Sequence, residues 1–237
     1  MPEAPSSSLS AFSRRRFLTH TGAAAASLLL LTACPDPEPP VTPTPTISFT
    51  GGDEGVLSYF YLLTRYSAEF YTAVLTTPPA DLSAAELALL RDISRHLLIH
   101  RELLSLAASD NSITLNNGVR EVSFAYTPTY TLSTRAGVLA AAQAIGDLVV
   151  AAHCGAAKLL TSVYLLRLVT KMTAVRARHA AAIRDLRLAG SFAATDVVPT
   201  TGAEAGLNQA LTPTEVLTEL GKLTSPIVLA AGSLPTS

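Results

Sequence analysis

The sequence predicts an all-α protein, a four-helix bundle with a long crossover between its second and third helices and a short C-terminal helix. Apolar residues recur with helical periodicity in four long segments, and sevenfold spacing is clearest in the first, second and fourth. Short connections join the first segment to the second and the third to the fourth, whereas residues 109–134 separate the second from the third without that periodicity. One long and two short connections among four helices are typical of a bundle with a single crossover.

Local signals place the ends of each helix. The predicted ranges are 53–75, 83–108, 135–153 and 162–188. Thr76-Thr77-Pro78-Pro79 stops the first, because proline cannot continue a helix. Ser83 opens the second as a capping box with Glu86 three residues later, and Gly190 closes the fourth. The residues in sevenfold register are Val56, Leu63 and Phe70, then Leu90, Leu97 and Leu104 with Ile93, His100 and Ala107, and finally Leu165, Met172, His179 and Leu186.

The segments between and after these helices are less regular. Asn116-Asn117-Gly118 is a turn signal within the crossover, where Thr, Tyr and Val are frequent, so a short hairpin is an option there. A Gly/Ala/Thr-rich loop follows the fourth helix. Thr212 then provides an N-cap and Pro213 a first helical residue for the short last helix.

The N-terminus carries an export signal. Arg14, Arg15, Phe17 and Leu18 resemble the twin-arginine (Tat) motif, whose machinery carries folded proteins across the bacterial inner membrane. The apolar run that follows, residues 17–33, is about 17 residues long and rich in alanine. This suits a cleaved signal better than a span of roughly 20 strongly apolar residues. A short N-terminal membrane helix is the alternative.

Leu31-Thr32-Ala33-Cys34 resembles a lipobox, in which the cysteine is acylated and becomes the first residue of the mature chain. Six prolines in residues 35–45 predict an extended tether after it. The expected parts are therefore a signal peptide (1–33), a Pro-rich tether (34–50), a helical bundle (51–225) and a C-terminal tail (226–237). The predicted location is the cell envelope, with the lipid anchor at Cys34 facing the periplasm or the cell surface.

The net charge and the cysteine content exclude some classes of partner and some covalent links. Removing residues 1–33 takes away three arginines and Glu3 and leaves 14 basic and 17 acidic residues, a net charge of −3. A nucleic-acid partner is not expected, because such binders carry a basic stripe. Once Cys34 is acylated, Cys154 has no partner for a disulfide, and its alanine-rich surroundings predict a small buried apolar residue. The alanine-rich helices permit self-association.

Five short motifs occur in a characteristic order: Ala68-Glu69-Phe70-Tyr71, His100, Gly155-Ala156-Ala157, Ala177-Arg178-His179-Ala180-Ala181-Ala182 and Leu211-Thr212-Pro213. Together they resemble an exported bacterial ferritin-like domain family that is related to desiccation-associated proteins. The resemblance covers residues 51–223. It implies a ferritin-like bundle, and in the iron-binding members a di-iron centre held by Glu residues and Glu-x-x-His pairs.

This chain departs from that ligand set. The residues three positions before the histidines of the mature chain are Ile93, Leu97, Val150 and Arg176, and none is a carboxylate. By the resemblance, Thr64 and Ser67 stand at the two Glu positions of the first helix, Gly146 at the acidic position of the third, and Arg176 at that of the fourth. An arginine reverses the charge beside a metal, so we expect no di-iron centre and no cofactor.

The remaining polar core residues have two interpretations. His100 and His179 lie in core registers, either as hydrogen-bonded core histidines or as a mononuclear metal pair, and Asp92, His96 and His100 form a second row at i, i+4 and i+8. Arg176 lies in register with Val169 and Ile183 and should seek Asp147 or Glu69 as a buried partner. The tyrosines of the first helix (Tyr59, Tyr61, Tyr66 and Tyr71) are either packing residues with hydroxyls in solvent or a redox or sugar-binding stripe, and we favour packing.

The sequence therefore predicts a non-enzymatic, lipid-anchored structural or binding module with no catalytic residues, and the resemblance implies a stress or desiccation setting. One alternative is a metal-binding oxidoreductase or iron-handling protein with relocated ligands. Another is a carrier that uses a cavity left where the metal site was.

Overall fold

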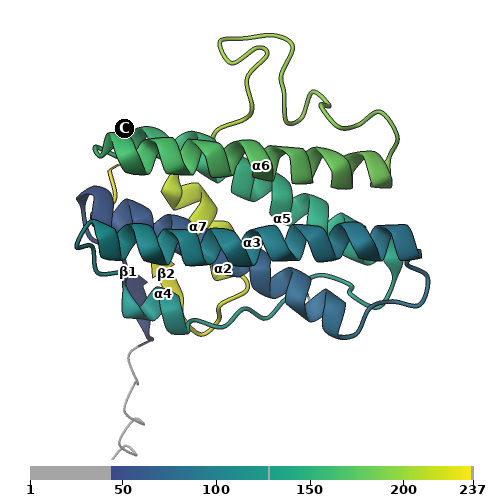
Figure 1. The fold of residues 1–237 in the computed structure, drawn as a ribbon, viewed down its shortest axis with the longest axis horizontal. Helices are drawn as coiled ribbons and strands as arrows, with labels where there is room; N and C mark the ends of the chain where they lie inside the picture. The colour runs from purple at the N-terminus through teal and green to yellow at the C-terminus, as the bar shows by residue number, and fades with distance from the viewer. Residues whose placement is uncertain (1–43, 128, 236–237) are drawn as a thin grey trace, which may run out of the picture. The chain divides into compact units, whose positions relative to one another are not determined.

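The computed structural model describes residues 44–127 and 129–235 and confirms the four-helix bundle (Figure 1). Its long helices are α2 (Gly52–Thr76), α3 (Ala84–Asp110), α5 (Arg135–Ala156) and α6 (Val163–Arg187), each within three residues of its predicted bounds. The short 3-10 helix η2 (Ala157–Leu159) follows α5. Helix α2 packs mainly on α3, and α5 on α6.

The predicted caps form as expected. The Ser83 hydroxyl accepts from the Glu86 amide at 3.2 Å, and the Glu86 carboxylate accepts from the Ser83 amide at 2.9 Å. Helix α7 (Pro213–Gly221) begins with an equivalent box between Thr212 and Glu215. These reciprocal bonds satisfy amides that the first helical turn leaves free, which is why both helix starts were readable from sequence.

The crossover contains a helix rather than the hairpin considered from sequence. Asn116 caps α4 (Asn117–Glu121), and its side-chain oxygen accepts from the Gly118 amide at 2.8 Å. Arg65 of α2 holds this segment by donating to the carbonyls of Val119 at 2.6 Å and Val122 at 2.9 Å. The crossover therefore packs against α2.

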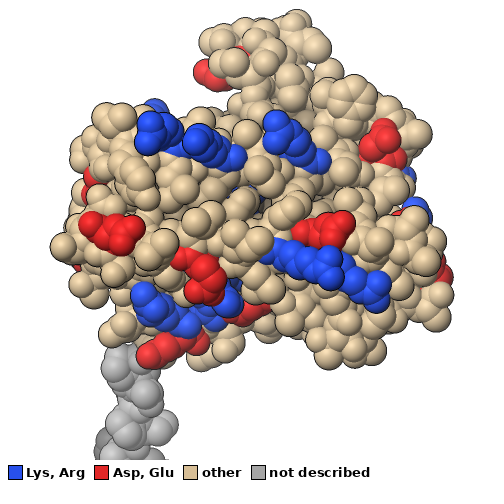
Figure 2. All heavy atoms as spheres, in the orientation of Figure 1, with Lys and Arg blue, Asp and Glu red and all other residues tan. Residues whose placement is uncertain are grey.

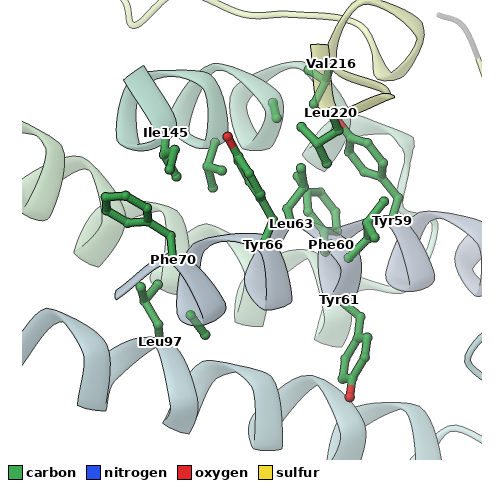
Figure 3. Close-up of a cluster of buried hydrophobic side chains, with 14 of the residues drawn as sticks. Tyr59, Phe60, Tyr61, Leu63, Tyr66, Phe70, Leu97, Ile145, Val216 and Leu220 are labelled. Atoms are coloured by element: carbon green, nitrogen blue, oxygen red, sulfur yellow. The ribbon is translucent and has the colours of Figure 1, made fainter. Parts of the chain in front are cut away.

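Helix α2 is buried along most of its length, and its aromatic side chains point to different neighbours (Figure 3). The four tyrosines Tyr59, Tyr61, Tyr66 and Tyr71 are 0–7% exposed, which confirms that they pack. Their hydroxyls were expected to reach solvent, and this is wrong for at least two of them. The Tyr66 hydroxyl lies 3.2 Å from that of Tyr130, and the Tyr59 hydroxyl is buried without a partner among the described residues.

The folded unit extends beyond both predicted boundaries. Strand β1 (Thr46–Ser48) pairs in parallel with β2 (Val228–Ala230), with Ile47 opposite Leu229. Phe49 and Leu234 are buried beside them. The predicted ends of the tether at 50 and of the bundle at 225 are therefore wrong. The two strands lie outside those limits, and each supplies the other's hydrogen-bond partners. Residues 1–43, including the export motif and Cys34, lie outside the described residues.

Among the described residues, one helix is long and apolar enough to span a membrane, at Arg135–Leu159, which covers α5 and η2. More than half of its most apolar stretch is buried inside the bundle, as expected of a core helix. Cys154 on this helix was predicted to be buried and is instead half-buried, and burial raises the pKa of its thiol.

Candidate functional site

The polar interior of the bundle is built around Arg176 of α6. Its side chain is buried, with only 4% of the residue exposed, and its guanidinium donates to the Thr64 hydroxyl of α2 at 2.6 Å. That hydroxyl in turn donates to the Phe60 carbonyl at 2.8 Å. Thr64 can therefore accept from Arg176 while its own proton is used, and this chain of bonds joins α2 to α6 across the core.

The expected ion pair of Arg176 with Asp147 or Glu69 is wrong. Asp147 is held by Arg184, whose guanidinium reaches its two oxygens at 2.7–3.0 Å. Glu69 is paired with Arg65 one turn earlier on α2. Both carboxylates are partly exposed, because the helices turn them away from the bundle axis. They are not part of the polar core in which the sequence placed them.

Two further positions where the resemblance places ligands are used for packing. The Ser67 hydroxyl donates to the Leu63 carbonyl at 3.0 Å. At Gly146, an added Cβ would lie 3.3 Å from the Ala180 Cβ of α6, so the glycine allows α5 and α6 to approach closely. The four positions at which the resemblance places acidic ligands therefore carry no carboxylate. Two carry hydroxyls (Thr64 and Ser67), Gly146 has no side chain, and Arg176 carries a positive charge.

His153 is a core residue that the sequence analysis did not single out. It is fully buried on α5, with its ring centroid 4.7 Å from that of Phe60 and its Nδ1 3.0 Å from the Thr173 hydroxyl. Since that hydroxyl donates to the Val169 carbonyl at 2.8 Å, Nδ1 must carry the proton and Nε2 is left bare. Nε2 has no partner among the described residues.

His100 and His179 were considered either as hydrogen-bonded core histidines or as a metal pair, and no hydrogen bond joins the two among the described residues. His100 is buried, and its Nδ1 has no partner among the described residues. His179 is half-buried and instead meets the exposed His96, with 3.1 Å between Nε2 of His179 and Nδ1 of His96 and the two rings nearly parallel. Asp92 bonds to Arg95, so the row of Asp92, His96 and His100 does not converge.

The charge of this interior is positive. Burial lowers the pKa of Arg176 to about 9, which still leaves it protonated at neutral pH. Burial, with Arg176 as a further cause, lowers the pKa of His100 to about 3 and that of His153 well below its ordinary value. Burial, with His96 and then Arg176, lowers that of His179 to about 4. One guanidinium beside neutral imidazoles does not fit a pair of divalent cations, which need several carboxylates. Within the described ranges, no three His, Cys, Asp or Glu side chains gather as a metal site.

A small cavity of about 20 Å³ lies beside Arg176. Its lining includes Ser67, Tyr71, Gly146 and His179. A volume of roughly 10–15 Å³ by this measure holds one water molecule, so the cavity admits a single small species and is too small for an organic ligand. This size argues against the carrier interpretation.

The surface contrasts with this interior. On the face drawn in Figure 2, basic side chains gather over α6, and both signs of charge lie over α3. Arg176 is therefore distinguished from the surface cations by its burial and by the absence of a carboxylate partner among the described residues.

Comparison with known protein families identifies the family of this fold. A family model described as a ferritin-like domain matches residues 52–189, from the start of α2 to just beyond the end of α6. No curated protein and no solved structure matches the chain. The matched range contains Thr64, Ser67, Gly146 and Arg176 and spans the four long helices.

Proposed function

This chain belongs to the ferritin-like domain family, and we propose that it is a member in which a buried arginine has replaced the di-iron ligands, leaving a non-catalytic structural or binding module. The observation that carries the proposal is the bond between Arg176 and Thr64. Two positions that would bear carboxylates in an iron-binding relative bond directly to each other. The bundle is thus held across its axis by the protein itself.

Electrostatics favour this function over iron handling. Two like unit charges about 4 Å apart repel by roughly 4 kcal/mol at an effective dielectric near 20, and a divalent ion doubles that figure. Asp147 and Glu69 are the carboxylates closest in sequence to Gly146 and Ser67. They are paired with Arg184 and Arg65, so they cannot offset this repulsion. Neutral imidazoles add dipoles but no negative charge.

The proposed setting is the bacterial cell envelope, with a stress or desiccation role by analogy with the related proteins. The Tat machinery would export the folded chain through its recognition of Arg14 and Arg15, and membrane lipid would anchor it through Cys34. A chain without an internal disulfide suits folding in the reducing cytoplasm before export.

The export proposal has a direct test. Replacing Arg14 and Arg15 with lysine should keep the protein in the cytoplasm, because the Tat signal depends on the arginine pair. Replacing Cys34 with alanine should allow export but abolish incorporation of labelled palmitate. Cell fractionation with immunoblotting measures both effects, and Cys154→Ala serves as the matched cysteine control. Normal export of the double lysine variant would contradict the Tat assignment.

The alternative function, a metal-binding oxidoreductase with relocated ligands, is favoured by one observation. The rings of His96 and His179 lie close together at an accessible edge of the bundle. Imidazole pairs can hold zinc or copper without carboxylates.

A thermal-shift experiment separates the two functions. We expect Zn²⁺, Mn²⁺ and anaerobic Fe²⁺ at about 100 times a micromolar Kd to leave the Tm unchanged, whereas a bound ion would add about 2.7 kcal/mol of stability at that excess. His179→Ala is the matched control. A rise in Tm that this substitution removes would support the relocated metal site and overturn the proposed function.

A further inference from the structure

We propose that the cavity beside Arg176 binds one monatomic anion, chloride in the cell, as the counter-charge of the buried guanidinium. The inference goes beyond the proposed loss of iron, because it assigns a ligand of opposite sign to the same region of the core. It rests on the charge, burial and size of the site and is independent of export or lipidation.

The hydrogen bonds of Arg176 leave its charge without a counter-ion among the described residues. Its guanidinium donates to a neutral hydroxyl, that of Thr64, and its Nε is buried without a partner among the described residues. Asp147 and Glu69 are occupied by Arg184 and Arg65. Buried charges in proteins are paired, since an isolated ion loses its hydration without compensation. An anion supplies that pairing where the chain does not.

The groups that face Arg176 favour an anion over a cation. The imidazoles of His100 on α3, His153 on α5 and His179 on α6 are the titratable neighbours whose charge is coupled to it, and all three are neutral at pH 7. Tyr71 of α2 also lines the cavity, and only 4% of the residue is exposed. The site therefore offers one buried cation beside neutral neighbours.

The size of the site selects the ligand. At about 20 Å³ the cavity accepts one small species. Phosphate, sulfate and organic carboxylates are too large to enter with their several heavy atoms. Gly146 of α5 contributes no side chain to the lining, Arg176 reaches it from α6, and residues of α2 and α3 complete it, so all four long helices bound the space. Halide ions fit this description.

The test compares thermal unfolding in sodium chloride and in sodium gluconate at equal ionic strength, since gluconate cannot enter the cavity. Chloride at 100-fold excess over its Kd should raise the Tm by roughly 5–10 °C more than gluconate does. Arg176→Met should lose this chloride-specific increment. Arg178→Met, which removes an exposed arginine two residues later on α6, should keep it. An increment that is absent from the wild type, or unchanged in Arg176→Met, would overturn the proposal.

Crystals soaked in sodium bromide give a second measurement that does not depend on the folding of a variant. The proposal predicts an anomalous bromide peak within hydrogen-bond distance of the Arg176 side chain. Density for water alone in this cavity, with bromide bound elsewhere on the surface, would show that the guanidinium is solvated rather than neutralised. Iron content is measured separately, so either idea can fail without the other.

Discussion

Lowering the pH from 7 to 5 should destabilise the protein, by about 2 kcal/mol through the buried imidazole of His100 and further, in the same direction, through that of His153. His153 is fully buried, and its bare Nε2 could accept a proton only at the cost of a second cation near Arg176. His100 is subject to the same two effects, burial and the charge of Arg176. His179, whose pKa is about 4, also stays neutral down to pH 5 and changes the stability in the same direction.

The direction follows from the depressed pKa values. In the unfolded chain each imidazole takes up a proton near pH 6.5. In the folded protein the pKa of His100 is about 3 and that of His153 lies well below its ordinary value. The stability is therefore complete above pH 6.5 and falls as the pH drops toward those lower values. Glu86, whose pKa is lowered to about 2 chiefly by Arg135, stabilises the fold above its ordinary pKa of 4.5 and loses that contribution only below it, so it adds no pH dependence between pH 7 and 5.

Urea denaturation at pH 7, 6 and 5 measures this loss. His153→Gln should reduce the dependence by about one proton, which is roughly 1.4 kcal/mol per pH unit. Arg178→Gln, at an exposed position that carries no imidazole, is the matched control and should keep the wild-type slope. Equal stability at pH 7 and pH 5 would contradict the buried neutral state of these histidines.

Replacing Gly155 with alanine should cost about 3 kcal/mol and lower the Tm by roughly 6–12 °C. An added Cβ at Gly155 would lie 1.9 Å from the Leu211 carbonyl oxygen and 2.7 Å from its carbon, so the backbone of the segment before α7 must move. The Leu211 amide also donates to the Ala151 carbonyl of α5 at 3.0 Å. Gly155 therefore provides the surface on which this segment docks.

The Gly155→Ala substitution should also disturb the core, because the displaced segment leads directly into α7. Thr212 caps that helix immediately after Leu211, and Val216 and Leu220 of the helix are fully buried in the aromatic cluster of α2 (Figure 3). Moving Leu211 displaces these side chains. The displacement explains why Gly155-Ala156-Ala157 and Leu211-Thr212-Pro213 occur as partner motifs in one chain.

Gly146→Ala is the matched control for this effect, because it adds the same atom to the same helix. Its Cβ would meet the Ala180 Cβ at 3.3 Å, which needs a shift of only a few tenths of an ångström. The better helix propensity of alanine offsets that cost, so we expect a net change within about 1 kcal/mol. Thermal unfolding of both variants, followed by circular dichroism, compares them. A Gly155→Ala protein as stable as Gly146→Ala would show that Leu211 is not fixed by this contact.

Local signals made the helices predictable from sequence. Capping residues such as Ser83 and Thr212 act on amides within a few positions, and sevenfold apolar spacing reports the buried face directly. The pairing of β1 with β2 was not predictable in this way, because three-residue strands at opposite ends of the described chain carry no local pattern.

The site was only partly predictable for a related reason. The register of Arg176 with Val169 and Ile183 correctly indicated its burial. Its partner was wrongly assigned, because neighbouring helix positions point about 100° apart, and Asp147 turns away from the axis that Gly146 faces. His153 was overlooked because α5 is apolar on nearly every side, so its periodicity does not distinguish one buried face from another.

Metal analysis of the protein purified from its native envelope tests the central claim most directly. If the Arg176–Thr64 bond has replaced the ligands, the preparation should contain fewer than about 0.1 iron atoms per chain and show no absorption from an oxo-bridged iron pair. Close to two iron atoms per chain, with that absorption present, would contradict the account.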